Sequence, residues 1–323
     1  MTLISRLKTT ASSLVRSAGG VALGLGLVAA LVGGLPAPAF AQTPAVAPVA
    51  VPRAEGTGPA LWVIKDADST LYLFGTVHLL RPTTAWGTDR VDNAFNSASR
   101  VVFEISNPDD QAAVMPLIQQ YGISPQTPLS SLLSAEELVT LDTVAKTIGL
   151  SAAQLDPLRP WFAALTLSLA PLAEAGYDPA SGVELILKAR AEAAGKPVSG
   201  FETIDEQIRI LAGFPEADQL AFLRSTLEDF ESATVELDRL VTAWATGDVG
   251  GIESIGVVPM RETSEPLYQA LLVKRNTNWA DQIQTLLEGS GTVFIAVGAA
   301  HLAGDDSVQE ILEERGVNVE VAP

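Results

Sequence analysis

The two histidines of this 323-residue chain are the residues with the clearest capacity for chemistry, and each stands three positions after a glycine. His78 ends a Gly-Thr-Val-His sequence that starts at Gly75, and His301 ends a Gly-Ala-Ala-His sequence that starts at Gly298. Imidazole nitrogens bind metal ions and transfer protons near neutral pH. One such histidine is more often structural, but the repeated pattern favours a shared functional site.

Each glycine stands at the end of a strand that is predicted to be buried on both faces: Gly75 near the end of residues 70–76, and Gly298 directly after residues 292–297. In open α/β sheets, ligands bind at the edge where parallel strands end. We therefore expect both imidazoles at that edge. Gly75 and Gly298 are interpreted as structural turns, where the exit from the strand requires a positive φ or a ligand approaches the backbone closely.

Glu104 interrupts an otherwise apolar strand predicted over residues 100–105, where a carboxylate needs a partner. With His78 and His301 it forms a suitable ligand set for a divalent metal that activates water. The same three residues could instead act without metal, as general acid and base. The alternative for Glu104 is a structural salt bridge to an arginine, for which the candidates are Arg100, Arg159 and Arg275.

Two further glutamates are candidates for a second catalytic carboxylate. Glu202 is favoured because it lies at the exit of a short strand, whereas Glu184 starts a helix and could only be answering the helix dipole. Arg275 and Asn276 precede a helix and could bind substrate, pair with a buried acid, or simply form a helix junction.

The order of elements predicts an α/β fold with a central mixed, largely parallel sheet and a large helical insertion. A hairpin is expected over residues 61–76, followed by a helix over 88–98, a strand over 100–105 and helices over about 107–194. Long helices are predicted over 215–246 and 262–273. The folded domain should span residues 61–323.

The first 41 residues read as a secretory signal peptide, with basic residues before an apolar run and a small-residue cleavage site after Ala41. Residues 42–60 read as an Ala/Pro-rich linker. A periplasmic or secreted protein is expected, with membrane contact only through the signal segment before cleavage; a retained anchor is the alternative. The net charge of −18 argues against nucleic acid as a partner, and the absence of cysteine excludes disulfides and thiolate ligands.

Several of these motifs in this order resemble the TraB/GumN family, whose members include relatives of the Tiki proteases. The segments that carry the resemblance are 61–64, 73–78, 102–104, 195–198, 201–207, 275–279 and 297–304. The resemblance implies a fold similar to the erythromycin-esterase and haem-binding ChaN-like group. It also implies an active site built from paired Gly-x-x-His turns and a glutamate, carried here by Gly75, His78, Glu104, Gly298 and His301, with Glu202 provisional.

Tiki-type members are metal-dependent peptidases, so the resemblance implies manganese or cobalt, with zinc as a further candidate. We therefore predict a metal-dependent, peptidase-like hydrolase that acts on a peptide or small-molecule substrate. The alternatives are a haem- or metal-binding envelope protein without catalysis, and an exopolysaccharide-related assembly factor. Glu184 departs from the family pattern, because an aspartate is expected there in many relatives.

Overall fold

A computed structural model describes residues 51–323 of the chain. The predicted signal peptide and its cleavage position lie outside the described residues. The described end of the predicted linker packs against the folded body, since the Pro52 carbonyl accepts hydrogen bonds from the amides of Trp86 and Gly87, both at 3.0 Å. No helix within residues 51–323 is long and apolar enough to cross a bilayer.

A six-stranded sheet forms the centre of the molecule, in the order β4-β3-β5-β2-β1-β6. Four neighbouring strands are parallel: β4 (Val198–Glu202), β3 (Arg100–Ile105), β5 (Gly291–Gly298) and β2 (Ser69–Thr76). The predicted hairpin joins β2 to the antiparallel strand β1 (Leu61–Lys65), and β6 (Val319–Val321) completes that side. The predicted mixed, largely parallel sheet is confirmed.

The pairing of β2 with β5 places the two Gly-x-x-His turns side by side. Thr76 is the register partner of Gly298, so both strands end at the same level of the same edge. Neither glycine has a positive φ, and that explanation of their presence is wrong. Close approach explains Gly75, because a Cβ there would lie 3.2 Å from the Cα of Ala299. The close neighbour is the other turn.

The sheet separates two hydrophobic cores, because successive strand residues face opposite sides. Phe103 of β3 faces the larger core, which is covered by α3 (Asp89–Ser97), α8 (Pro160–Glu174) and other helices. Val102 faces a smaller core under α16 (Lys274–Leu287) and α17 (Val308–Glu314). By the same alternation, Glu104 faces α16.

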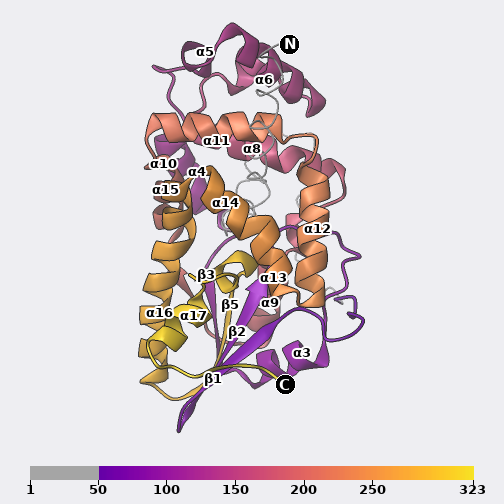
Figure 1. The fold of residues 1–323 in the computed structure, drawn as a ribbon, viewed down its shortest axis with the longest axis vertical. Coiled ribbons are helices and arrows are strands. Elements are labelled where there is room, and N and C mark those ends of the chain that lie inside the picture. The colour runs from indigo at the N-terminus through magenta and orange to yellow at the C-terminus, as the bar shows by residue number, and fades with distance from the viewer. Residues whose placement is uncertain (1–50) are drawn as a thin grey trace, which may run out of the picture.

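The predicted helical insertion contains α4 to α9, of which α5 and α6 lie at the end of the molecule farthest from the sheet (Figure 1). Their bounds are α4 Gln111–Tyr121, α5 Leu129–Leu132, α6 Ala135–Thr147, α7 Ala152–Leu155, α8 as above and α9 Val183–Ala193. A capping box of Ser134 with Glu137 starts α6, and one of Thr203 with Glu206 starts α10 (Ile204–Ala212).

Two predicted helices are interrupted in the structure. The helix expected over 215–246 is two helices, α11 (Glu216–Glu228) and α12 (Ala233–Thr246), because the chain turns after Asp229, whose carboxylate accepts a hydrogen bond from Ser225 at 3.1 Å. As a result α11 lies across α8, while α12 runs down toward the sheet (Figure 1).

The second interrupted helix, expected over 262–273, is a series of short turns. After α13 (Val249–Ile252) and a first π-helical turn (Glu253–Val257) come α14 (Val258–Thr263), α15 (Glu265–Tyr268) and a second π-helical turn (Gln269–Val273). The last of these continues directly into α16. π-helical turns are frequently found at functional sites.

Candidate functional site

His78 follows β2 and is paired with Glu184 of α9. Its Nδ1 lies 2.9 Å from Glu184 Oε1, and Thr76 Oγ1 donates a hydrogen bond to the same oxygen. A carboxylate only accepts, so Nδ1 carries the proton and, in the neutral ring, Nε2 keeps its lone pair. Within the described part of the chain, His78 Nε2 and Glu184 Oε2 are buried without hydrogen-bond partners.

Backbone contacts dock the start of α9 against the turn that carries His78. The amide of Val183 donates to the carbonyl of Val77 at 3.1 Å, and a Cβ at Gly182 would lie only 2.3 Å from the His78 carbonyl oxygen. Only glycine permits this approach. The first turn of α9 therefore places Glu184 next to the imidazole.

The surroundings of His78 favour its protonated form. Burial lowers the pKa of the imidazole, but the charge and the hydrogen bond of Glu184 together raise it above its usual value of 6.5. The charge of Glu104 raises this pKa further and that of Arg275 lowers it, so both groups act on His78. The two sides of the sheet edge therefore form one electrostatic site.

Glu104 is 1% exposed and has hydrogen bonds to both carboxylate oxygens. Oε1 accepts from the Gly298 amide at 2.7 Å, and Oε2 accepts from Arg275 Nη2 at 2.7 Å and from Gln207 Nε2 at 3.1 Å. Burial alone would raise the pKa of Glu104, but the charge of Arg275 holds it at about 2, with smaller contributions from His301 and His78 when they are protonated and from the Gly298 amide. The salt bridge considered as the alternative for Glu104 is therefore present, with Arg275 as its partner.

His301 lies on a short 3-10 helix (Ala299–Leu302) after β5 and has a partner at each ring nitrogen. Nδ1 lies 2.5 Å from Asn276 Oδ1, and Nε2 lies 3.0 Å from Arg275 Nη1. A guanidinium only donates, so Nε2 accepts and Nδ1 donates to the amide oxygen. Asn276 Nδ2 donates to the Asp306 carbonyl at 2.7 Å, which agrees with this amide orientation. His301 is therefore neutral, with its proton on Nδ1.

Arg275 joins these groups to the predicted carboxylate Glu202. Its Nε donates to both oxygens of Glu202, at 3.0 and 3.1 Å, and Trp279 Nε1 donates to the same carboxylate at 2.9 Å. Glu202 thus contacts Arg275 rather than a histidine. We call this set the Arg275 cluster; its members are Glu104, Glu202, Arg275, Asn276, Trp279 and His301.

The predicted metal-ligand set is not assembled in this arrangement. Glu104 Oε1 and His301 Nε2 are 3.8 Å apart, but the Arg275 guanidinium is hydrogen-bonded to both side chains. Among residues 51–323, no three His, Asp or Glu side chains are grouped so that they could hold an ion. These residues as arranged do not fit a shared divalent ion, and the metal stays a prediction.

The sequence therefore anticipated the residues at this edge better than their pairing. It named both histidines and Glu104, with Glu202 as a provisional member, and left open whether Arg275 and Asn276 bind substrate, pair with a buried acid or form a helix junction. In the structure Glu104, Glu202, Arg275, Asn276 and His301 form one hydrogen-bonded cluster, and His78 lies on the neighbouring turn. It ranked Glu184 below Glu202, although Glu184 is the carboxylate that contacts His78. The motif Gly182-Val183-Glu184 was the available signal. Gln207 donates a hydrogen bond to Glu104, and the sequence indicated it only as part of the segment 201–207 that carries the family resemblance.

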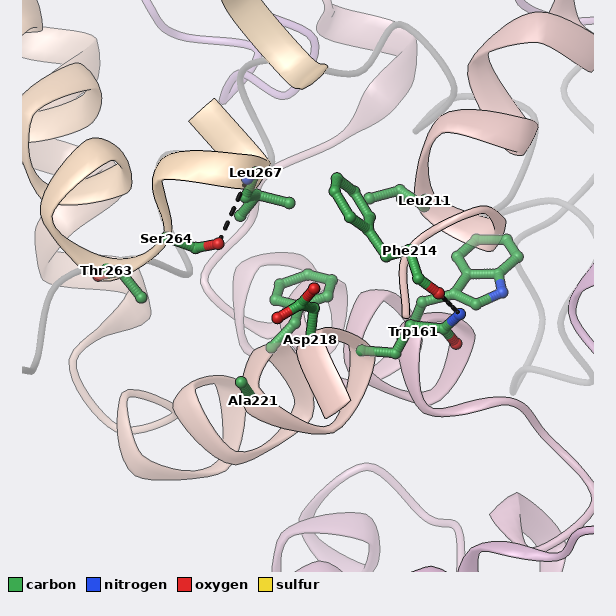
Figure 2. Close-up of a pocket in the computed structure, with 10 residues that line it drawn as sticks. Trp161, Leu211, Phe214, Asp218, Ala221, Thr263, Ser264 and Leu267 are labelled. Carbon is green, nitrogen blue, oxygen red and sulfur yellow. Dashed lines mark hydrogen bonds between the residues drawn. The ribbon is translucent and has the colours of Figure 1, made fainter. Parts of the chain in front are cut away.

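A separate cavity of about 80 Å³ lies in the helical layer, where side chains from α8, α11 and α15 face one another (Figure 2). Apolar side chains dominate its lining, with Trp161, Phe214 and Leu267 among them and Asp218 as the one charged group. None of its lining residues belongs to the histidine site. The cavity is therefore a distinct feature of the helical layer.

Comparison with known proteins agrees with the resemblance carried by the motifs. The chain is 23% identical over 258 residues to the uncharacterized protein YbaP of Escherichia coli, covering 79% of this chain and 92% of YbaP. It is 22% identical over 270 residues to an uncharacterized protein of Treponema pallidum, covering 79% and 80%. It is 24% identical over 313 residues to the metalloprotease TIKI1 of Danio rerio, covering 81% of this chain and 63% of TIKI1.

No solved structure matches the chain significantly. The sequence model of the TraB/PrgY/gumN family matches residues 60–321, which span the whole sheet and both Gly-x-x-His turns. The chain therefore belongs to the TraB/PrgY/gumN family.

Proposed function

We propose that this protein is a hydrolase in which His78 is the general base and Glu184 orients it. The observation that carries the proposal is the bond from Nδ1 to Glu184 Oε1, which leaves the buried Nε2 with no partner among the described residues. Buried polar atoms normally have partners, so such an atom is a suitable place for a reacting group. The carboxylate fixes the tautomer and orientation of the ring.

The proposed reaction is the attack of water on a carbonyl carbon. His78 Nε2 takes one proton from the water while the oxygen forms a bond to the carbonyl carbon. The resulting imidazolium is stabilised by Glu184 and then gives its Nε2 proton to the leaving nitrogen or oxygen as the old bond breaks. A peptide or related small molecule is the proposed substrate, supported by distant relatives that are named metalloproteases.

The charges of the Arg275 cluster act on this base in opposite directions. The buried anion Glu104 favours the imidazolium form of His78, whereas the Arg275 guanidinium opposes it. His78 itself is 5% exposed, so the side chains that cover it must separate before a substrate reaches Nε2. The structure thus corresponds to a closed form of the proposed site.

The test is the substitution His78→Asn, assayed by mass spectrometry on a defined peptide mixture. The asparagine amide can still donate to Glu184, so the fold should be kept while the base is lost. We expect the rate to fall about 10²- to 10⁴-fold, as is typical for a general base. Thermal unfolding of the variant serves as the control for folding. A well-folded variant with full activity would remove His78 from the mechanism.

A metal-dependent hydrolase is the second candidate, favoured by the names of the TIKI relatives and by the His78–Glu184 pair itself. Metal-binding histidines commonly donate their other ring N–H to a carboxylate. Activity that disappears in metal-free protein and returns with Mn²⁺, Co²⁺ or Zn²⁺ would favour this candidate. Unchanged activity after metal removal would favour the general base.

We also propose that the protein is exported to the periplasm or secreted, with cleavage after Ala41. The basic start, the apolar run and the small residues before Gln42 support this proposal. Mass spectrometry of the protein isolated from its native host should show a chain that begins at Gln42. A chain that still contains residues 1–41 would contradict cleavage and favour a retained anchor.

A further inference from the structure

We propose that Arg275 is the built-in cation of this site: its guanidinium takes the position between Glu104 and His301 that a divalent ion would need, so these two residues do not ligate metal in this chain. This inference rests on the proposed function, because it states which residues of the proposed hydrolase site can bind a metal ion. It concerns metal binding, however, and is tested without an activity assay.

Hydrogen bonds fix the Arg275 side chain in place. All three guanidinium nitrogens have acceptors: Nε bonds Glu202, Nη2 bonds Glu104, and Nη1 bonds both His301 and the carbonyl of Leu271, the latter at 3.1 Å. Leu271 belongs to the π-helical turn before α16. The side chain is therefore fixed from its own helix as well as from two strands.

The Arg275 guanidinium is also buried against the aromatic ring of Trp279. Arg275 is 4% exposed, and its guanidinium carbon lies 4.7 Å from the centroid of the Trp279 ring. The same ring lies 4.3 Å from the ring of His301. A cation over an indole face is a favourable arrangement when water is excluded. Moving Arg275 out would therefore break contacts on every side.

The positive charge of Arg275 also opposes a second cation at this position. Glu104 is a buried carboxylate and Glu202 a partly buried one, with its side chain 10% exposed, and the two share one guanidinium. A divalent ion between Glu104 and His301 would stand next to this positive group, and like charges in a buried site repel strongly. The ion and the guanidinium therefore exclude each other, and the residue type at position 275 decides which of the two is present.

The lone pair of His301 that a metal would need is already used in a hydrogen bond from Arg275. A metal bond to Nε2 needs the electron pair that now accepts from Arg275 Nη1, and Nδ1 donates to Asn276. The ring has no second lone pair to offer in this tautomer. His301 can therefore bind a metal only if Arg275 is displaced.

The experiment is a calorimetric titration of untagged protein with Co²⁺, comparing wild type, Arg275→Ala and the double variant Arg275→Ala/His301→Ala. We expect Arg275→Ala to gain an ion site at least tenfold tighter than any in the wild type, and the second substitution to remove that gain. An Arg275→Ala protein that folds and binds Co²⁺ no better than the wild type would overturn the proposal.

A measurement on the unsubstituted protein keeps the proposal testable if Arg275→Ala does not fold. The chain has two histidines, so ¹⁵N-histidine labelling gives only two imidazoles to follow by NMR. On titration with Zn²⁺, an unchanged His301 Nε2 signal supports the proposal, whether or not His78 responds. A shift of His301 Nε2 with stoichiometric Zn²⁺ would overturn it. Neither readout depends on hydrolysis, so an inactive protein would refute the proposed function and leave this inference standing.

Discussion

The two Gly-x-x-His turns have the same pattern and adjoin each other at one sheet edge, yet the helices around them give the two imidazoles different chemistry. His78 meets α9, which supplies one carboxylate and leaves Nε2 without a partner among the described residues. His301 meets α16, which supplies a partner to each ring nitrogen. The strands therefore determine where the two imidazoles lie, and the neighbouring helices determine the hydrogen-bond partners of each.

This contrast also separates reactivity from stability. On the His78 side, His78 Nε2 and Glu184 Oε2 are buried without partners among the described residues, as expected where a substrate is bound. On the Arg275 side, the orphan atom among these residues is Gln207 Oε1, which belongs to a supporting amide and is not an ionisable group. The Arg275 side contains a hydrogen-bonded network of buried charges, which is costly to disturb. If this division is right, substitutions on the two sides should change different measured quantities.

The largest expected effect on stability is that of Arg275→Ala. The substitution leaves the buried Glu104 and the partly buried Glu202 without their shared cation, which should lower the free energy of unfolding by about 3–5 kcal/mol. Arg315→Ala is the matched control. Arg315 forms a surface salt bridge at 2.7 Å with Asp281, which lies on α16, the helix that carries Arg275. Its cost should stay below about 1 kcal/mol. Equal costs in urea unfolding would show that the cluster is not a special source of stability.

The next effect concerns acid. The pKa of Glu104 is lowered from 4.5 to about 2 in the folded protein, so its ionised form contributes stability above pH 4.5 that is lost as the pH falls toward 2. The shift corresponds to about 3 kcal/mol. Urea unfolding measured across this range should show a weaker pH dependence in Glu104→Gln than in the wild type. The same pH dependence in both proteins would contradict the assignment.

A smaller effect is expected on the pH dependence of hydrolysis. Glu184 raises the pKa of His78, so the wild-type rate should rise with pH as the imidazolium loses its proton, with a midpoint above 6.5. Glu184→Gln should move this midpoint to lower pH. Glu192→Gln, which changes an exposed glutamate on the same helix, should leave it in place. An unmoved midpoint in Glu184→Gln would break the proposed link between the two residues.

The convergence of the site could be predicted from the sequence because it depends on short, strongly patterned strands. Two buried runs ending in glycine place His78 and His301 at one edge, and the charge at Glu104 within an apolar strand indicates a partner. Of the three candidate arginines, Arg275 is that partner. These conclusions need only strand periodicity and the rule that parallel strands share an edge.

The pairing of each histidine could not be predicted, because it depends on helix placement. Glu184 reaches His78 through the close backbone approach at Gly182, which no periodic pattern signals. Arg275 reaches His301 after a π-helical turn, which changes the phase of the side chains that follow. The break at Asp229 was missed for a similar reason, since the flanking segments both have helical patterns.

The most direct test of the difference between the two histidines is a pH titration of ¹⁵N-histidine-labelled, untagged protein followed by NMR. We predict that His78 titrates with a midpoint above 6.5, and that at neutral pH His301 carries its proton on Nδ1 while Nε2 accepts from Arg275. A His78 midpoint at or below 6.5, or a His301 protonated on Nε2 at neutral pH, would contradict this difference between the two histidines.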